Sequence, residues 1–276
     1  MDTVTLPDGS TMPKLGQGTW LIGDNEKTRA QEIEALREGV RLGLTLIDTA
    51  EMYGGGRSER LVGEAIADCR DEVYLVSKVT PGANRAQTIK ACEKSLRNLG
   101  TDRLDLYLLH WAGGTAFEET VDAFQQLVAD GKIRRFGVSN LGSGEVQDFC
   151  AVPGGDQTQV NQLLFNLSQR GIEWDLLPWM QRKGMAMMAY SPFDRVDLLQ
   201  HRGLREFAQA RDITPGQAAL AWLLGHDQVV PIPKASHLDR VRENAAALDV
   251  ALTAEDRDEL DVLFPPPTGP QYLEIY

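Results

Sequence analysis

A regular alternation of short apolar segments with longer segments of helical periodicity limits the folds open to this chain. Eight apolar segments recur, and each is followed by at least one segment in which apolar residues repeat at helical spacing. Strands that are buried on both faces of a parallel sheet are apolar almost throughout, so the alternation indicates a parallel sheet covered by helices. The expected strands are residues 15–18, 44–48, 73–78, 104–110, 133–139, 159–162, 185–190 and 229–231.

The segments of helical spacing follow the strands one by one, with an additional helix after each of the last two strands. A short hairpin over residues 4–10 is expected before the first strand, because Asp8-Gly9 is a typical turn pair. The Pro265-Pro266-Pro267 run begins an irregular tail. The expected helices are residues 26–43, 58–69, 85–99, 118–130, 144–150, 172–182, 204–211, 215–225, 238–246 and 254–263.

The length of the chain suits one closed β/α barrel, because 276 residues is close to the roughly 250 that this fold needs. An open, doubly wound sheet is the alternative, but that fold usually has a GxGxxG turn after its first strand, which this sequence lacks. No segment rich in Pro, Gly or Ser divides the chain. We therefore predict an α/β protein with a single (β/α)8 TIM barrel over residues 1–276, an N-terminal β-hairpin and two extra helices.

Charge and composition exclude several classes of protein. The formal net charge of −12 repels phosphate backbones, so we expect no nucleic-acid partner. The widely separated Cys69, Cys92 and Cys150 favour a reducing cytoplasm over a disulfide framework and lack metal-ligand spacing. No signal peptide and no membrane-spanning apolar run is expected. We predict a cytoplasmic monomer that acts on a small molecule and holds no metal.

Ionisable residues end three consecutive expected strands, the second, third and fourth. These residues are Asp48, Lys78 and His110. Taken singly, an acid there is more often a helix cap, a lysine more often solvent-exposed and a histidine more often structural. In a barrel, however, the carboxyl ends of the strands form one rim, and active sites lie on that rim. Tyr53, on the loop after Asp48, is within reach of the same place.

These four side chains suit the transfer of a proton to a carbonyl oxygen. A tyrosine is a weak acid with a reference pKa of about 10, and a nearby ammonium lowers that pKa. Lys78 would supply the ammonium and Asp48 would hold it through an ion pair, while neutral His110 would orient the carbonyl oxygen. None of these groups supplies a hydride, so the reduction of a carbonyl needs a cofactor.

A basic segment after the eighth expected strand is typical of a phosphate site. Lys234 follows that strand, and Arg240 lies on the next expected helix. Phosphate sites in β/α barrels are commonly built from the loops after the seventh and eighth strands. The N-terminus of the following helix would add partial positive charge. The alternative interpretation is a surface Lys-Arg pair that only solvates the helix.

Motifs along essentially the whole chain resemble those of the aldo-keto reductase family. Residues 48–53, Asp-Thr-Ala-Glu-Met-Tyr, are similar to the family's Asp-Thr-Ala-x-x-Tyr motif. The likeness is closest to the small bacterial branch that includes methylglyoxal reductases. The other motifs stand in the family's order: Ser77-Lys78, Leu108-Leu109-His110-Trp111, Gly137-Val138-Ser139-Asn140, Asn161-Gln162, Ala189-Tyr190-Ser191-Pro192, Ile232-Pro233-Lys234 and Arg240-Val241-Arg242-Glu243-Asn244.

The resemblance implies an NADPH-dependent oxidoreductase that reduces small aldehydes, ketoaldehydes or ketones to alcohols. It implies Tyr53 as the general acid and His110 as the group that orients the carbonyl oxygen. Asp48 and Lys78 would be the pair that tunes the acid. The residues implied to contact the substrate are Trp20, Tyr53, His110 and Trp111.

The resemblance also implies the contacts of the cofactor. Tyr190 would stack on the nicotinamide ring, as an aromatic face readily does. The groups expected on its carboxamide are Ser139, Asn140 and Gln162. The 2′-phosphate would be held by Lys234, Ser236 and Arg240, and the adenine contacted by Glu243 and Asn244. The other implied cofactor contacts are Gly18, Thr19, Trp20, Asp48, Ser191, Pro192, Phe193, Ile232 and Ala235.

One position departs from the family's pattern. The family often has Ser directly after the lysine of the phosphate segment, and Ala235 stands there instead. One hydroxyl contact to the 2′-phosphate is then missing unless Ser236 supplies it. NADPH is therefore the expected cofactor, and NADH the less favoured one.

Two other functions compete with carbonyl reduction. Lys78 at a barrel strand end would suit a Schiff base, as in barrel aldolases. That chemistry needs a lysine with a low pKa, whereas an Asp48 partner raises the pKa of Lys78. A non-catalytic subunit that binds a cofactor is the second alternative.

Residues 193–203 and 265–276 form short rim segments, which predicts an open pocket for small carbonyl compounds rather than a tailored steroid site.

Overall fold

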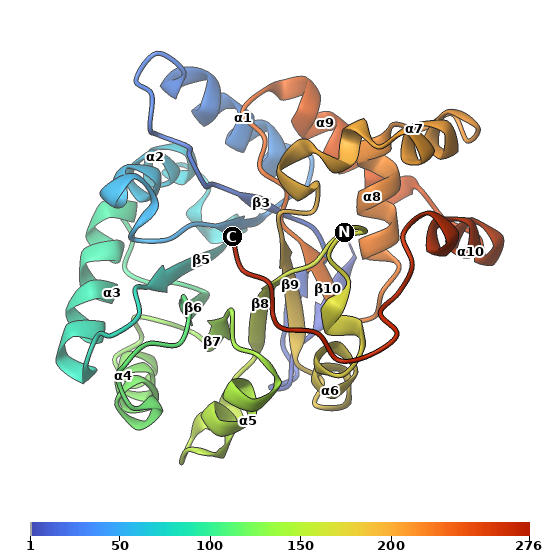
Figure 1. The fold of residues 1–276 in the computed structure, drawn as a ribbon. Helices are drawn as coiled ribbons and strands as arrows, with labels where there is room; N and C mark the ends of the chain where they lie inside the picture. Colours follow the sequence, from blue (N-terminus) through green and yellow to red (C-terminus); the bar gives the residue numbers. More distant parts are fainter. Residues whose placement is uncertain (1) are drawn as a thin grey trace.

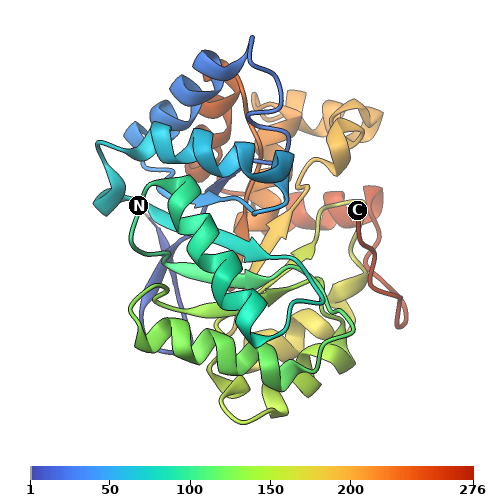
Figure 2. The same ribbon diagram turned by 90° about the vertical axis from the view of Figure 1, so that its left-hand side faces the viewer.

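Eight parallel strands form one sheet in which each strand pairs with the next strand along the chain (Figure 1). The computed structural model describes residues 2–276. The sheet curves into a barrel that is surrounded by helices (Figures 1 and 2), which confirms the predicted (β/α)8 fold. The strands are β3 (Gly16–Gly18), β4 (Leu46–Asp48), β5 (Tyr74–Val79), β6 (Leu106–Leu109), β7 (Phe136–Ser139), β8 (Val160–Leu164), β9 (Ala186–Tyr190) and β10 (Val229–Pro231).

The barrel is completed where β3 meets the segment that follows β10. The backbone N–H of Gly18 donates to the carbonyl oxygen of Pro233 at 3.0 Å, and Gly18 forms a parallel bridge with Lys234. A Cβ atom on Gly18 would lie 2.7 Å from the carbonyl oxygen of Ile232. The two backbones therefore approach this closely because residue 18 has no side chain.

Ten helices cover the outside of the barrel within residues 2–276, and three of them begin and end at the predicted residues: α3, α9 and α10. Capping boxes mark the starts of α3 at Asn84, α8 at Thr214 and α10 at Thr253. The helices are α1 (Arg29–Arg41), α2 (Arg57–Ile66), α3 (Arg85–Leu99), α4 (Phe117–Ala129), α5 (Ser143–Ala151), α6 (Leu176–Arg182), α7 (Arg202–Gln209), α8 (Pro215–Leu224), α9 (Leu238–Ala246) and α10 (Ala254–Leu263).

The helix predicted over residues 172–182 is wrong in its first half. The chain forms a 3₁₀ turn at Gly171–Glu173, and α6 begins only at Leu176. Pro178 explains the break, because a proline inside a helix lacks an N–H and clashes with the carbonyl group four residues earlier. With the helix starting at Leu176, Pro178 lies in the first turn, where its missing donor is tolerated.

The alternation of side chains along each strand divides the core into two layers. On β6, Leu106 and Leu108 belong to a cluster inside the barrel, while Tyr107 and Leu109 belong to the larger cluster between sheet and helices. The hairpin of β1 (Thr3–Thr5) and β2 (Thr11–Pro13) forms where it was predicted. Its apolar residues join the inner cluster: Val4, Leu6 and Met12. The hairpin therefore closes the end of the barrel opposite the carboxyl ends of the strands.

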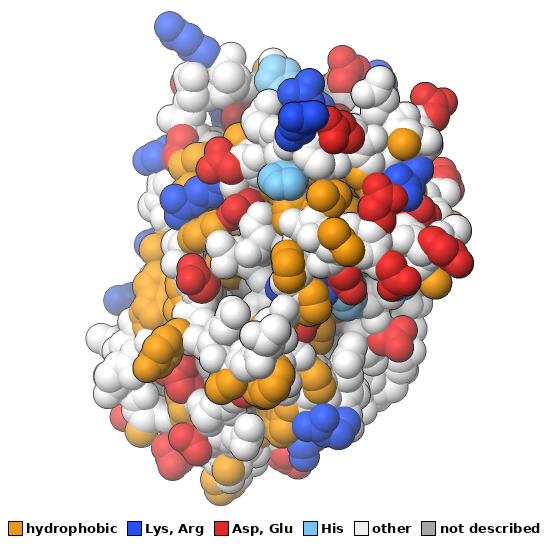
Figure 3. All heavy atoms as spheres, turned by 45° about the vertical axis from the view of Figure 1, so that its right-hand side comes forward, with side chains coloured by type: hydrophobic (Ala, Val, Ile, Leu, Met, Phe, Trp, Pro, Cys, Tyr) orange, Lys and Arg blue, Asp and Glu red, His pale blue; other side chains and the backbone are white. Residues whose placement is uncertain are grey.

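The irregular tail after α10 reaches the carboxyl ends of the strands (Figure 1). The hydroxyl of Tyr276 donates to the Asp194 carboxylate, and the Arg195 guanidinium lies 4.2 Å from the Tyr276 ring centroid. The predicted open mouth is thus partly crossed by the tail. On the face shown in Figure 3, acidic and basic side chains are interspersed. Across residues 2–276, the helices are too short or too polar to cross a membrane.

Gly18→Ala is expected to destabilise the barrel, because its methyl group would meet a backbone oxygen that cannot rotate away. The free energy of unfolding should fall by about 1–3 kcal/mol in urea titrations. Gly144→Ala on α5 is the control, since no atom lies within 4 Å of a Cβ there. Equal stability of the two variants would contradict this account of barrel closure.

Candidate active site

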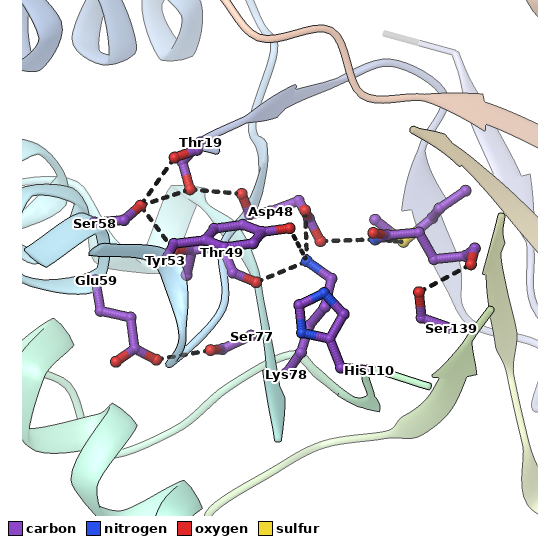
Figure 4. Close-up of polar contacts among 12 residues, drawn as sticks. Thr19, Asp48, Thr49, Tyr53, Ser58, Glu59, Ser77, Lys78, His110 and Ser139 are labelled. Carbon is purple, nitrogen blue, oxygen red and sulfur yellow. Dashed lines mark hydrogen bonds and ion pairs between the residues drawn. The ribbon is translucent and has the colours of Figure 1, made fainter. Parts of the chain in front are cut away.

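The three predicted strand-end residues lie together at the carboxyl end of the barrel (Figure 4). Asp48 is the last residue of β4, Lys78 lies in β5 and His110 directly follows β6. These strands are neighbours in the sheet, so their ends lie side by side. Tyr53 returns to the same place on a 3₁₀ turn, Tyr53–Gly56, which links β4 to α2. The fold thus brings all four candidate residues into one cluster.

The ammonium group of Lys78 is fully buried and donates to three oxygens. Its Nζ lies 2.7 Å from Asp48 Oδ2, 2.9 Å from the Thr49 carbonyl oxygen and 3.3 Å from the Tyr53 hydroxyl. An ammonium has three N–H donors, so each has an acceptor. Burial alone would lower the pKa of Lys78, but the Asp48 carboxylate and the Tyr53 oxygen raise it above its ordinary value. Lys78 therefore stays charged at neutral pH.

Asp48 is held from two sides. Its Oδ2 accepts from Lys78, and its Oδ1 accepts from the Gln162 side-chain amide at 2.8 Å. Both oxygens of this buried carboxylate are satisfied, which a buried ion pair needs to offset its desolvation. Gln162 was expected on the cofactor carboxamide. The structure adds a contact that the sequence did not suggest, since its amide nitrogen fixes Asp48.

Burial decides the protonation of Tyr53. Its phenol ring stands edge-on to the His110 ring at 5.8 Å between centroids. Burial raises the pKa of Tyr53, and the charge of Lys78 lowers it by less. Lys78 lowers this pKa as predicted, but burial outweighs it, and the sequence did not show how deeply the phenol is buried. Tyr53 is protonated at neutral pH and has a proton to donate.

His110 is neutral, as predicted. Burial, together with the charge of Lys78, lowers the pKa of His110 to about 2. A neutral imidazole has one N–H donor and one acceptor nitrogen. The Trp111 ring lies 4.7 Å from the His110 ring, between centroids, so an aromatic wall adjoins the imidazole.

The residues expected at the nicotinamide lie at or near the carboxyl ends of β7, β8 and β9. The Asn140 side-chain amide donates to the His110 carbonyl oxygen at 3.1 Å and accepts from the Tyr190 hydroxyl at 2.9 Å. The Ser139 hydroxyl donates to the Gln162 carbonyl oxygen at 2.9 Å. Asn140 has a backbone φ of 56° and Ser191 one of 49°, values that residues other than glycine rarely adopt. Such strain is often found at ligand sites.

The residues expected at the 2′-phosphate lie around the start of α9. The Lys234 ammonium lies 2.5 Å from the Ser236 hydroxyl, so this hydroxyl stands beside the lysine despite Ala235. Arg240 is exposed and pairs with Glu243 at 2.5 Å. His237 precedes α9 without a side-chain cap, which leaves the first backbone N–H groups of the helix for an anion. Two cations, a hydroxyl and a helix N-terminus fit a phosphate group.

The other predicted contacts lie on the same rim or just beneath it. Thr19 is buried and donates from its hydroxyl to the Asp48 carbonyl oxygen at 2.9 Å, directly beside the catalytic candidates. Trp20 is half-exposed at the rim, and Asn244 is buried in α9. The remaining predicted positions lie in the loops that follow β9 and β10: Pro192, Phe193 and Ile232. Within residues 2–276, His, Cys, Asp and Glu form no cluster suited to a metal ion.

Most of the chain matches one known protein family. Residues 14–199 and 196–264 match the Aldo/keto reductase family. The chain belongs to the aldo/keto reductase family. It is therefore an oxidoreductase, as predicted.

Relatives of known name and structure extend over nearly the whole chain. The methylglyoxal reductase YeaE of Escherichia coli (strain K12) is 49% identical over 96% of this chain and 95% of its own length. The glyoxal reductase of Bacillus subtilis (strain 168) is 34% identical over 95% and 92%. An aldo/keto reductase of Klebsiella pneumoniae, solved with NADP and acetate, has a TM-score of 0.97 and 47% identity over 99% of both chains. The predicted likeness to a small bacterial branch is confirmed.

Three residues that contact this cluster or its immediate neighbours were not identified from the sequence: Thr49 contacts Lys78, Ser58 contacts Thr19 and Thr49, and Glu59 contacts Ser77. The Thr49 carbonyl oxygen accepts from Lys78, and a backbone oxygen leaves no trace in residue type. Ser58 and Glu59 start α2, where a serine and an acid are ordinary helix-start residues. Their contacts join segments that are far apart in the sequence, so no local pattern could have singled them out.

The low pKa of His110 predicts a specific loss of stability in acid. In the unfolded chain the imidazole has a pKa near 6.5, and in the folded chain about 2. Below pH 6.5 the unfolded state binds a proton that the folded state does not, so the free energy of unfolding falls as the pH falls. At pH 4.5, wild type should lose roughly 2.5 kcal/mol more than His110→Gln, relative to pH 7.5.

Urea titrations of both proteins at the two pH values measure this difference. His237→Gln, at an exposed imidazole, is the control for a His-to-Gln substitution outside the buried cluster. An equal loss in wild type and His110→Gln would show that His110 is not held neutral.

Proposed function

We propose that this protein reduces small aldehydes, ketoaldehydes and ketones to alcohols with NADPH, and that Tyr53 is the general acid. The observation that carries the proposal is the buried, charged Lys78 at 3.3 Å from the hydroxyl of a protonated Tyr53. A proton donor for a carbonyl oxygen needs a proton at neutral pH and a nearby positive charge that favours its loss in the transition state. Tyr53 has both.

Each residue of the cluster has a separate task in this mechanism. When bound, NADPH supplies a hydride to the carbonyl carbon. Tyr53 gives its proton to the carbonyl oxygen, and the Lys78 ammonium stabilises the negative charge that develops on the phenol oxygen. Neutral His110 hydrogen-bonds the carbonyl oxygen and orients it. Asp48 keeps Lys78 in place and charged.

The residues around the rim would hold the cofactor. Tyr190 would stack on the nicotinamide, next to the strained backbone at Asn140 and Ser191. Lys234 and Arg240 would hold the 2′-phosphate at the start of α9. The K. pneumoniae structure with NADP, which shares the fold at a TM-score of 0.97, supports this choice of cofactor.

The substrate class is supported by two observations. Both named relatives are described as reductases of small dicarbonyl compounds, methylglyoxal and glyoxal. In this protein the tail ends beside the loop after β9, where Tyr276 contacts Asp194 and Arg195. A mouth that is partly crossed by the tail favours a small substrate over a bulky steroid.

The Schiff-base alternative does not fit the state of Lys78. That chemistry requires a neutral amine, whereas the Lys78 ammonium donates to three oxygens and has a raised pKa. Incubation with a carbonyl compound and borohydride should therefore leave no adduct on Lys78. A non-catalytic subunit would bind NADPH without reducing any carbonyl compound, so the turnover of the wild-type protein distinguishes it from an enzyme.

Tyr53→Phe should lower kcat for methylglyoxal reduction by about 100-fold to 10,000-fold, since it removes the proton donor and keeps the ring. The dissociation constant for NADPH, measured by fluorescence, should stay within about twofold. Tyr107→Phe is the matched control, because that buried tyrosine packs between sheet and helices and its hydroxyl forms no hydrogen bond with Asp48, Tyr53, Lys78 or His110. If Tyr53→Phe kept the turnover of Tyr107→Phe, the general-acid assignment would be wrong.

Lys234→Ala should raise the Michaelis constant for NADPH by about tenfold, because it removes a charged contact to the 2′-phosphate. The constant for NADH should hardly change, since NADH has no phosphate at that position. Lys90→Ala, on the exposed side of α3, controls for the loss of a surface charge. Equal effects of Lys234→Ala on both coenzymes would overturn the phosphate assignment.

A further inference from the structure

The turn that presents Tyr53 is built from glycine and does not fix its own shape. Gly54, Gly55 and Gly56 have φ values of 56°, 61° and 87°, in the left-handed region that glycine adopts most readily. Glycine also visits many other conformations, so such a turn keeps its shape only if its ends are held. One end follows β4 at Asp48, and the other is the start of α2.

The first turn of α2 carries two fully buried polar residues, Ser58 and Glu59. We call these two residues the α2 clamp. Figure 4 shows that both point toward the strand ends that carry the candidate catalytic residues. Helix starts usually face solvent at such positions, so a buried serine and a buried carboxylate there need partners.

Ser58 links three segments through hydroxyl groups. Its Oγ lies 2.9 Å from Thr19 Oγ1, 3.1 Å from the Thr19 carbonyl oxygen and 3.1 Å from Thr49 Oγ1. Thr19 follows β3 and Thr49 follows β4, and both are fully buried. Ser58 therefore ties α2 to the loops on both sides of the Asp48 strand end.

The protons of these hydroxyls can be assigned one by one, because each hydroxyl has a single proton. Thr19 donates to the Asp48 carbonyl oxygen at 2.9 Å. Ser58 must then direct its proton at Thr19, whose hydroxyl oxygen at 2.9 Å is nearer than its carbonyl oxygen at 3.1 Å, and Thr49 must donate to Ser58. The result is a directed chain from Thr49 through Ser58 and Thr19 to the backbone of Asp48. Thr49 also accepts from Lys78 through its carbonyl oxygen, so both ends of the chain meet the ion pair.

Glu59 holds the strand that carries Lys78. One carboxylate oxygen accepts from the Ser77 hydroxyl and the other from the Asn98 amide, both at 2.8 Å. Ser77 precedes Lys78 in β5, and successive side chains of a strand point to opposite faces. Ser77 therefore faces the helices while Lys78 faces the barrel interior. A tie on Ser77 fixes the backbone from which Lys78 extends.

We propose that Ser58 and Glu59 are positioning residues, which hold Tyr53 at hydrogen-bonding distance from Lys78 by clamping the glycine turn to β4 and β5. This inference rests on the proposed role of Tyr53 as general acid. Neither residue touches the reacting atoms. Ser58 acts through Thr19 and Thr49, and Glu59 acts through Ser77.

The two ties have different expected effects. Ser77→Ala removes the hydrogen bond between Glu59 and β5 and should slow single-turnover reduction about tenfold, because Tyr53 and Lys78 are then held less firmly at hydrogen-bonding distance. The affinity for NADPH should stay unchanged. Ser58→Ala should slow the reduction by a similar factor and also weaken NADPH binding about threefold, since Thr19 is one of the residues expected to contact the cofactor. Stopped-flow oxidation of bound NADPH by methylglyoxal measures the rate, and fluorescence titration measures the affinity.

Ser95→Ala is the matched control. Ser95 is a fully buried serine on neighbouring α3 and forms no hydrogen bond with Ser58, Glu59 or Ser77. Its loss should leave rate and affinity within about twofold of wild type. Thermal unfolding of all variants shows whether each one folds, and Ser77→Ala and Ser58→Ala test the clamp independently of each other.

A double variant separates this inference from the proposed function. If the clamp acts through Tyr53, adding Ser77→Ala to Tyr53→Phe should cause no further loss of the residual rate. The clamp would be overturned if Ser58→Ala and Ser77→Ala reacted as fast as Ser95→Ala. In that case a slow Tyr53→Phe would still support the role of Tyr53 as general acid. A fast Tyr53→Phe would instead overturn the general acid itself.

Discussion

The ammonium group of Lys78 is fully buried at the carboxyl end of the barrel, and the rest of the site is arranged around it. Taking a charge out of water costs several kcal/mol, which only close partners offset. Asp48, the Thr49 carbonyl oxygen and the Tyr53 hydroxyl are those partners. Because they come from β4 and from the loop after it, the charge is stable only when β4 and β5 pair in register and the loop folds back over them.

The same charge sets the protonation of its neighbours. Burial and the Lys78 charge act in the same direction on His110 and keep it neutral. They act in opposite directions on Tyr53, where burial prevails and the phenol keeps its proton. At neutral pH the cluster therefore contains one ion pair, one neutral phenol and one neutral imidazole. That combination suits the donation of one proton to an oxygen that is gaining negative charge.

Much of the fold was predictable because its signals are local. Apolar strands, helical spacing and the Asp8-Gly9 turn are each visible within a short window, and α3 agrees with its prediction to the residue. The prediction of a helix over residues 172–182 was wrong in its first half, because Pro178 limits the helix to residues from Leu176 onward although the apolar spacing continues before it. The direction of the Tyr53 pKa could not be predicted for another reason, since burial depends on what the whole chain packs around the phenol.

By itself the sequence determined the order of strands and helices, the family, and the three strand ends where Asp48, Lys78 and His110 meet. It could do so because parallel strands in a barrel place their carboxyl ends on one rim. Only the tertiary structure decided how the site is held: that Gln162 fixes Asp48, that Ser58 ties the start of α2 to Thr19, and that Glu59 ties it to Ser77 in β5. These contacts join residues far apart in the chain, and no local pattern encodes the distance between them.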